Sequence, residues 1–175
     1  MKAIQFGAGN IGRGFLAQLF FQSGYETVFV DINRKVISEL NRRKSYMLKI
    51  VGENPQSIAI RDVRALNITD IQAVAKEFVD ADIIATAVGV NVLEKIAPVL
   101  AEGINLRAEN RLSAPLNIII CENLLEAGKF LKAQVKKNIK SAYSDYLDKN
   151  VGFVESVVSR MIPVVPPEIS GKDPL

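Results

Sequence analysis

Apolar runs and helix-spaced apolar positions alternate along most of this chain. Residues 3–6, 27–30, 83–89 and 116–121 are short, almost continuously apolar runs, which is the pattern of strands buried on both faces of a parallel sheet. Between these runs, apolar residues recur at the spacing of amphipathic helices. Strands that alternate with helices predict an α/β fold of the Rossmann type, with an open, mostly parallel sheet and helices on both faces.

The boundaries of the helices are predicted from capping and breaking residues. Asn33 and Asp70 are natural N-caps for two of the helices. The helix that contains Pro98 is expected to bend or break at that residue and to continue poorly to Gly103. We therefore expect the polar residues 105–115 to form a loop.

An extra β-hairpin interrupts the alternation of strands and helices. Residues 46–51 alternate in the manner of a strand, and the sequence Gly-Glu-Asn-Pro at residues 52–55 predicts a turn. The apolar positions in residues 58–63 then return the chain as the second strand of the hairpin.

The end of the chain changes in composition. Residues 151–163 read as a strand that passes into an extended stretch, and Pro166-Pro167 with the polar residues after them predicts a linker. We therefore predict one dinucleotide-binding domain over residues 1–163 and a linker over residues 164–175.

The stretch Met1–Gly14, MKAIQFGAGNIGRG, carries the most specific chemical pattern in the chain. A predicted strand over residues 3–6 leads into Gly7, Gly9 and Gly12 and then into a helix. The first glycine permits a tight turn, the second lets a pyrophosphate approach the backbone, and the third lets helix and strand pack closely. The free N–H groups at the start of the helix favour an anion. The pattern thus predicts a dinucleotide site; the alternative is an ordinary βαβ unit with a glycine-rich turn.

Asp31 bears on the identity of the dinucleotide. It ends the second predicted strand, where a carboxylate accepts hydrogen bonds from the adenosine ribose hydroxyls. Its charge repels a 2′-phosphate, so NAD is favoured over NADP. Arg34 could instead serve such a phosphate, and NADP therefore stays the alternative cofactor.

Small and polar residues follow two further buried strands. Residues 86–89 and Glu122 with Asn123 stand at carboxyl ends of strands, where open α/β sheets bind their ligands. We expect the first group to border the cofactor, unless Gly89 only ends its strand. The second group supplies candidates for nicotinamide or substrate contact, although Asn123 could equally cap the next helix. The predicted cofactor-binding residues are Ala3, Ile4, Gln5, Phe6, Gly7, Ala8, Gly9, Asn10, Ile11, Gly12, Arg13, Gly14, Asp31, Thr86, Val88, Gly89 and Asn123.

Composition narrows the chemistry further. A chain of 175 residues, 49% of them apolar, suits one domain with a core of its own. It has no histidine and one cysteine, Cys121, so we expect neither a metal site nor an internal disulfide.

The apolar runs are too short to span a membrane, and the first residues do not have the pattern of a signal peptide. These two features predict a cytoplasmic protein without a membrane partner. The net charge is +3, and we expect the lysines between residues 129 and 140 to form a solvated helix face rather than a nucleic-acid site.

Several segments together resemble one family. MKAIQFGAGNIGRGF at the start, TAVG at residues 86–89, LEKIAP at 93–98, PLNIIICEN at 115–123 and VGFVES at 151–156 are similar to the mannitol-1-phosphate 5-dehydrogenases, which are polyol-specific long-chain dehydrogenases. The resemblance covers essentially the whole chain. It implies the NAD-binding domain of an oxidoreductase that interconverts D-mannitol 1-phosphate and D-fructose 6-phosphate by hydride transfer, usually without a metal.

The same resemblance implies what this chain lacks. The family's catalytic Lys-x4-Asn-x2-His pattern lies in a mostly helical second domain, which also holds the sugar phosphate, and Ser159 stands where family members carry Asp. We therefore expect an N-terminal part of a longer enzyme, assign no catalytic residue to it, and expect it to be inactive alone. The alternatives are a stand-alone NAD-sensing module and another polyol or uronate dehydrogenase of the same superfamily.

Overall fold

The computed structural model of the chain describes residues 1–52, 54–160, 162 and 173–175. The described residues form a six-stranded parallel sheet in the order β5-β2-β1-β6-β7-β8. The chain builds one half outward from β1 and then returns to build the other half from β6, so the topological switch point lies between β1 and β6. This confirms the predicted open sheet. Its strands are β1 (Lys2–Phe6), β2 (Glu26–Asp31), β5 (Val63–Asn67), β6 (Ile83–Thr86), β7 (Leu116–Ile120) and β8 (Val151–Glu155).

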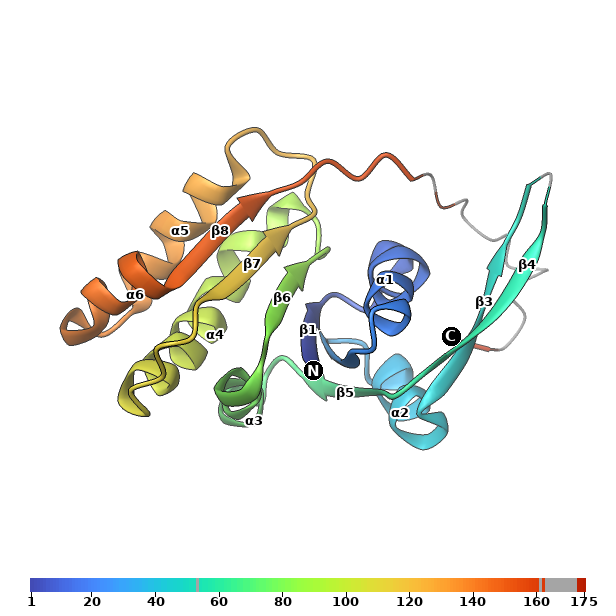
Figure 1. Cartoon of the computed structure of the whole chain (residues 1–175), viewed down its shortest axis with the longest axis horizontal. Helices are drawn as coiled ribbons and strands as arrows, with labels where there is room; N and C mark the ends of the chain where they lie inside the picture. Colours follow the sequence, from blue (N-terminus) through green and yellow to red (C-terminus); the bar gives the residue numbers. More distant parts are fainter. Residues whose placement is uncertain (53, 161, 163–172) are drawn as a thin grey trace.

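Helices cover both faces of the sheet, as predicted (Figure 1). One face carries the helical segment formed by η1 (Gly12–Leu16) and α1 (Ala17–Gln22), together with α2 (Arg34–Arg43). The other face packs against α3 (Ile71–Glu77), the short η2 (Phe78–Asp80), α4 (Val90–Glu109), α5 (Ala127–Asn138) and α6 (Ser144–Asn150). No helix in this part of the chain is long and apolar enough to cross a membrane.

Alternate residues of β1 supply the two cores. Ala3 belongs to the cluster under α1, whereas Ile4 and Phe6 belong to the larger cluster under α3, α4 and α5. All three are fully buried. Because side chains of a strand alternate between faces, a strand covered on both sides must be apolar throughout, which is why these strands read as continuous apolar runs.

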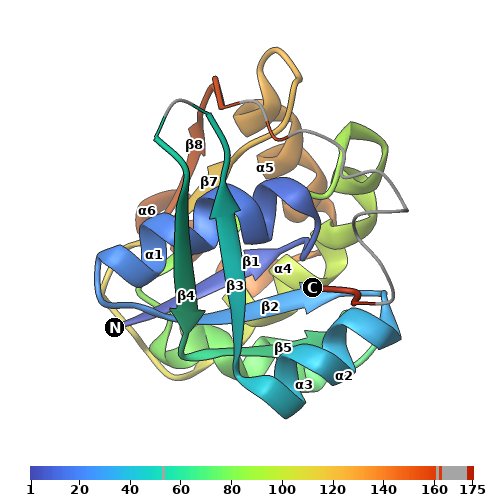
Figure 2. The ribbon, with the colours of Figure 1, turned by 90° about the vertical axis from the view of Figure 1, so that its right-hand side faces the viewer.

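The predicted hairpin is present, but its second strand ends earlier than expected. β3 (Ser45–Ile50) pairs with β4 (Gln56–Arg61) as a separate antiparallel ribbon that lies over α1 and α2 (Figure 2). Asp62 then takes a left-handed conformation with φ of 55°. Val63 starts β5 and pairs with Thr27 of β2. The prediction that residues 58–63 form one strand was therefore wrong at its end, because the reversal at Asp62 sends Val63 into the main sheet.

A break of the helix at Pro98, one of the two outcomes expected there, is also wrong, whereas a bend stays a prediction. α4 continues through Pro98 to Glu109, and the predicted loop at residues 105–115 is helical in its first part. Pro98 is exposed, so the carbonyl left without its usual N–H partner can be hydrated. The apolar face of α4 continues beyond it, and burial of that face stabilises the helix.

A buried arginine holds the second half of α4. Arg107 is 2% exposed, and its Nη1 donates to the carbonyl oxygens of Phe78 at 2.6 Å and Ala81 at 3.3 Å. Its Nη2 donates to the carbonyl oxygen of Ala114 at 2.8 Å. These bonds satisfy both terminal nitrogens of the buried guanidinium, whereas its Nε has no partner among the described residues. A reading of the sequence as a polar loop places this side chain in solvent.

The C-terminal part agrees with the prediction up to residue 160. β8 is followed by residues 156–160 without regular structure, as expected for an extended stretch. α6, which precedes β8, was not predicted. The predicted domain boundary at residue 163 and most of the predicted linker lie outside the described residues. Of that linker, Asp173 forms an ion pair of 2.7 Å with Arg43.

Candidate functional site

The first two glycines of the motif differ sharply in their surroundings. Gly7 has φ of 92°, and a Cβ there would overlap the carbonyl oxygen of Ala87 at the end of the neighbouring strand. Its N–H donates to the carbonyl oxygen of Val30 at 2.9 Å. By contrast, a Cβ on Gly9 would meet no atom within 4 Å. Gly7 therefore makes the turn at the switch point, and Gly9 leaves open space above the loop.

The third glycine lets the start of the helix pack closely against the turn at Gly7. A Cβ on Gly12 would overlap the carbonyl oxygen of Gly7, so the helix can approach the turn this closely only without a side chain. Helical backbone begins at Asn10, and the N–H groups of its first turn have no intrahelical acceptor. The loop thus presents N–H groups below a clear space, which is an arrangement that favours an anion.

Gln5 braces the glycine turn from inside the protein. It is fully buried, and its Nε2 donates to the carbonyl oxygens of Phe6 at 2.8 Å and Gly7 at 3.3 Å. Its Oε1 has no hydrogen-bond partner among the described residues. Of the other β1 residues predicted to bind the cofactor, Ala3 and Ile4 place their side chains in the two cores. Their direct role in binding stays a prediction.

Asp31 lies at the glycine loop, where the sequence predicts it. Its Oδ2 accepts the N–H of Ala8 at 2.6 Å, and its Oδ1 accepts the N–H of Asn33 at 2.8 Å. The first of these bonds was not foreseen, and it gives the carboxylate a second task of holding the loop. Arg34 instead lies on α2, where it lines a shallow hollow of about 530 Å³ together with Arg42.

Arg13 ties the loop to the hairpin. Its Nε donates to the carbonyl oxygen of Ala8 at 2.6 Å, and the hydroxyl of Tyr46 donates to the carbonyl oxygen of Arg13 at 2.6 Å. Burial raises the pKa of Tyr46, so its hydroxyl keeps the proton that it donates. Tyr46 was not among the predicted site residues, because nothing in an alternating hairpin pattern marks one aromatic residue as a support for a distant loop.

The next strand ends contribute a second group beside the loop. Thr86 is fully buried at the end of β6, and the N–H of Ala87 donates to the carbonyl oxygen of Phe6 at 2.9 Å. Beyond it, the carboxylate of Glu122 accepts the N–H groups of Val88 at 2.7 Å and Gly89 at 2.9 Å. Burial raises the pKa of Glu122, and these bonds offset part of the rise.

Asn123 is not the cap of the helix that follows it. α5 starts at Ala127, and its N-cap position is Glu126, which has φ of 56° and makes no side-chain capping bond. The N-terminus of α5 is instead held by Glu155, whose Oε1 accepts the N–H of Gly128 at 3.1 Å. A contact between Asn123 and the cofactor stays a prediction.

Two solved structures with similar folds are a dehydrogenase and a reductase. Octopine dehydrogenase matches 93% of this chain and 40% of its own, with a TM-score of 0.60 and 9% identity. A ketopantoate reductase of the PanE/ApbA family from Ralstonia eutropha matches 79% of this chain and 38% of its own, with a TM-score of 0.53 and 16% identity. At these identities the likeness shows the Rossmann-like fold alone.

Curated relatives agree much more closely in sequence. Mannitol-1-phosphate 5-dehydrogenase of Buchnera aphidicola is 41% identical over the whole chain, and that of Lactiplantibacillus plantarum is 38% identical over 94% of it. The chain spans about 44% and 43% of the lengths of these relatives. A family model described as the mannitol dehydrogenase Rossmann domain matches residues 1–175. The resemblance seen in the sequence is thereby confirmed, and the chain belongs to the mannitol dehydrogenase Rossmann domain family.

Proposed function

We propose that this chain binds NAD(H) as the nucleotide domain of an oxidoreductase that interconverts D-mannitol 1-phosphate and D-fructose 6-phosphate. The clear space above Gly9 carries the proposal, because backbone atoms close the loop at both Gly7 and Gly12. A loop that served packing alone would not need a glycine with clear space around it between two glycines that are enclosed by backbone atoms. A pyrophosphate fits that space and meets the N–H groups of the first helical turn.

The two halves of the sheet suit the two halves of the dinucleotide. Asp31 ends β2, so the half made of β1, β2 and β5 is placed to hold the adenosine ribose. The half made of β6, β7 and β8 is then left for the nicotinamide nucleotide, with residues 86–89 as its wall. The carboxylate of Asp31 disfavours a 2′-phosphate and supports NAD rather than NADP.

The bound nicotinamide supplies the hydride chemistry, and residues of this chain bind and orient it. We assign the proton acceptor to residues outside this chain. The chain has no histidine, and lysines on α5 such as Lys132 and Lys136 form ion pairs of 2.8 and 3.1 Å with Asp148 at the surface.

The proposed substrate is the one for which the relatives are named. A cytoplasmic location stays a prediction. An assay of the protein that contains this chain tests the activity: it should form NADH from NAD and D-mannitol 1-phosphate, and do so faster than from unphosphorylated mannitol or with NADP. Turnover that prefers another polyol or a uronate would assign the protein to a different activity of the superfamily. NADH binding without any turnover would favour an NAD-sensing module.

A further inference from the structure

Glu122 occupies an unusual position at the carboxyl edge of the sheet. β6 and β7 lie side by side, with Thr86 opposite Ile120, and α4 begins just beyond β6 (Figure 1). From the end of β7, Glu122 reaches back across this edge. Each of its two carboxylate oxygens accepts one backbone N–H, those of the consecutive residues Val88 and Gly89.

This arrangement is specific to an ionised carboxylate. Its hydrogen-bond partners in the described part of the chain are these backbone N–H groups, rather than a lysine or arginine. Both N–H groups lie at the start of α4, whose dipole favours a negative charge there. An amide side chain of the same shape would present one N–H₂ group to an N–H group and lose one of the two bonds.

The segment that Glu122 holds is a wall of the predicted cofactor crevice. The carbonyl oxygen of Ala87 and the side chain of Val88 are the atoms that a Cβ on Gly7 would meet, so this segment lies against the glycine turn at the switch point. Gly89 has φ of 89° and open space around it. Without an anchor, the backbone at such a glycine can adopt many conformations.

We propose that Glu122 is a positioning residue for the nicotinamide half of the dinucleotide. It acts through Val88 and Gly89, which it fixes in the conformation that the nicotinamide ribose meets, and this role rests on the proposed NAD(H) binding. The adenosine half depends on Asp31 and on the glycine loop, and the hydrogen bonds of Glu122 to the described residues go to Val88 and Gly89 instead. The preformed wall lowers the ordering cost of binding.

The test compares two ligands on one variant. Glu122→Gln should weaken NADH binding by about tenfold, the size expected for a lost bond to a charged group. It should leave the affinity for ADP, which lacks the nicotinamide nucleotide, within about twofold. Calorimetric titrations measure both affinities. Glu155→Gln is the matched control, because it makes the same change one strand further along, at Gly128, and should leave the ratio of the two affinities unchanged.

A second variant keeps the proposal testable if Glu122→Gln does not fold. Gly89→Ala strains the same segment directly and should give the same selective loss of NADH binding. If the variants lose equal affinity for NADH and ADP, or lose affinity for neither, the positioning role is overturned. The proposed function stays intact in that case, provided that the wild-type chain binds NADH. Failure of the wild-type chain to bind either ligand would overturn both.

Discussion

The glycine loop shows how far single residues could be predicted from the sequence. The roles of Gly7, Gly9 and Gly12 follow from their spacing, and the space around each agrees with them. Two supports of the loop could not be predicted: the bond from Ala8 to Asp31 and the buried amide of Gln5. The first bond joins residues that are distant in sequence, and no local spacing encodes it. The second is local, but it depends on the direction in which the buried Gln5 side chain points, which a residue pattern does not specify.

Asp31→Asn tests the residue that discriminates between the cofactors. Asparagine removes the charge that repels a 2′-phosphate and weakens the hydrogen bonds to the ribose and to Ala8. We expect the NADH affinity to fall about tenfold and the NADPH affinity to fall less, so that the preference for NADH narrows.

Fluorescence titrations with NADH and NADPH measure the two affinities. The exposed Asp145→Asn on α6 is the control, since it removes an equal charge far from the loop and should change neither affinity. An unchanged preference in Asp31→Asn would show that Asp31 does not select the cofactor.

At the scale of elements, α4 shows where tertiary contacts outweigh the helix-breaking residues of the local sequence. The sequence places a proline near the middle of α4, and a glycine and a polar stretch in its second half, each of which favours an end to the helix. Gly103 lies against the ring of Phe78, and Arg107 binds carbonyl groups of the segment after α3. These contacts join elements that are distant in sequence, so propensity alone predicts the wrong boundary.

Gly103→Ala should destabilise the protein although alanine is the better helix former. Its Cβ would overlap the ring of Phe78, and such overpacking costs about 1–3 kcal/mol. That cost exceeds the gain in helix propensity of about 1 kcal/mol. Urea denaturation measures the free energy of unfolding. The control Gly9→Ala meets no atom within 4 Å and should change it little. A stabilised Gly103→Ala would contradict this packing.

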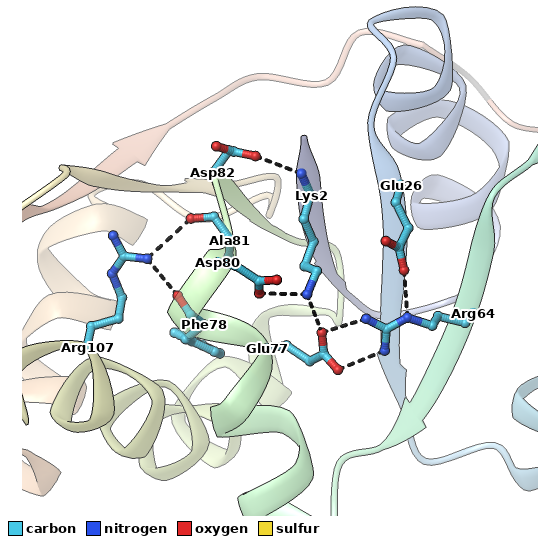
Figure 3. A network of polar contacts seen from close by, with 9 residues as sticks. All are labelled: Lys2, Glu26, Arg64, Glu77, Phe78, Asp80, Ala81, Asp82 and Arg107. Atoms are coloured by element: carbon cyan, nitrogen blue, oxygen red, sulfur yellow. Dashed lines mark hydrogen bonds and ion pairs between the residues drawn. The ribbon is translucent and has the colours of Figure 1, made fainter. Parts of the chain in front are cut away.

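At the scale of the whole molecule, the two edges of the sheet have different tasks. The carboxyl edge holds the candidate site, and the amino edge holds a network of charged groups (Figure 3). There Glu77 accepts hydrogen bonds from Lys2 at 2.8 Å and from two nitrogens of Arg64 at 2.8 and 2.6 Å. Arg64 also donates to Glu26 at 2.6 Å. The network joins β1, β2, β5 and α3.

Glu77 makes stability depend on acid pH. Burial tends to raise the pKa of Glu77, but the bonds from Arg64 and Lys2 outweigh it and lower the pKa. A lowered pKa in the folded state contributes stability above the unfolded value of about 4.3, and that contribution is lost as the pH falls through the folded value.

Glu77→Gln should therefore lower the free energy of unfolding at pH 7 by about 1–3 kcal/mol. It should also flatten the loss of stability between about pH 5 and pH 2, because the variant has no proton to bind at this position. Urea denaturation across this range provides the measurement. A parallel pH dependence in wild type and variant would mean that Glu77 is not the titrating group.

The central claim is that the loop around Gly9 receives the pyrophosphate of NAD(H). Calorimetric titration of NADH into the wild-type chain and into Gly9→Val tests it most directly. The valine side chain enters the open space, where a Cβ meets no atom of the protein within 4 Å. We expect saturable binding to the wild type, a loss of at least about 100-fold in the variant, and the same circular dichroism and melting temperature for both. Equal NADH affinity in a folded Gly9→Val would contradict the claim and leave the loop with a packing role alone.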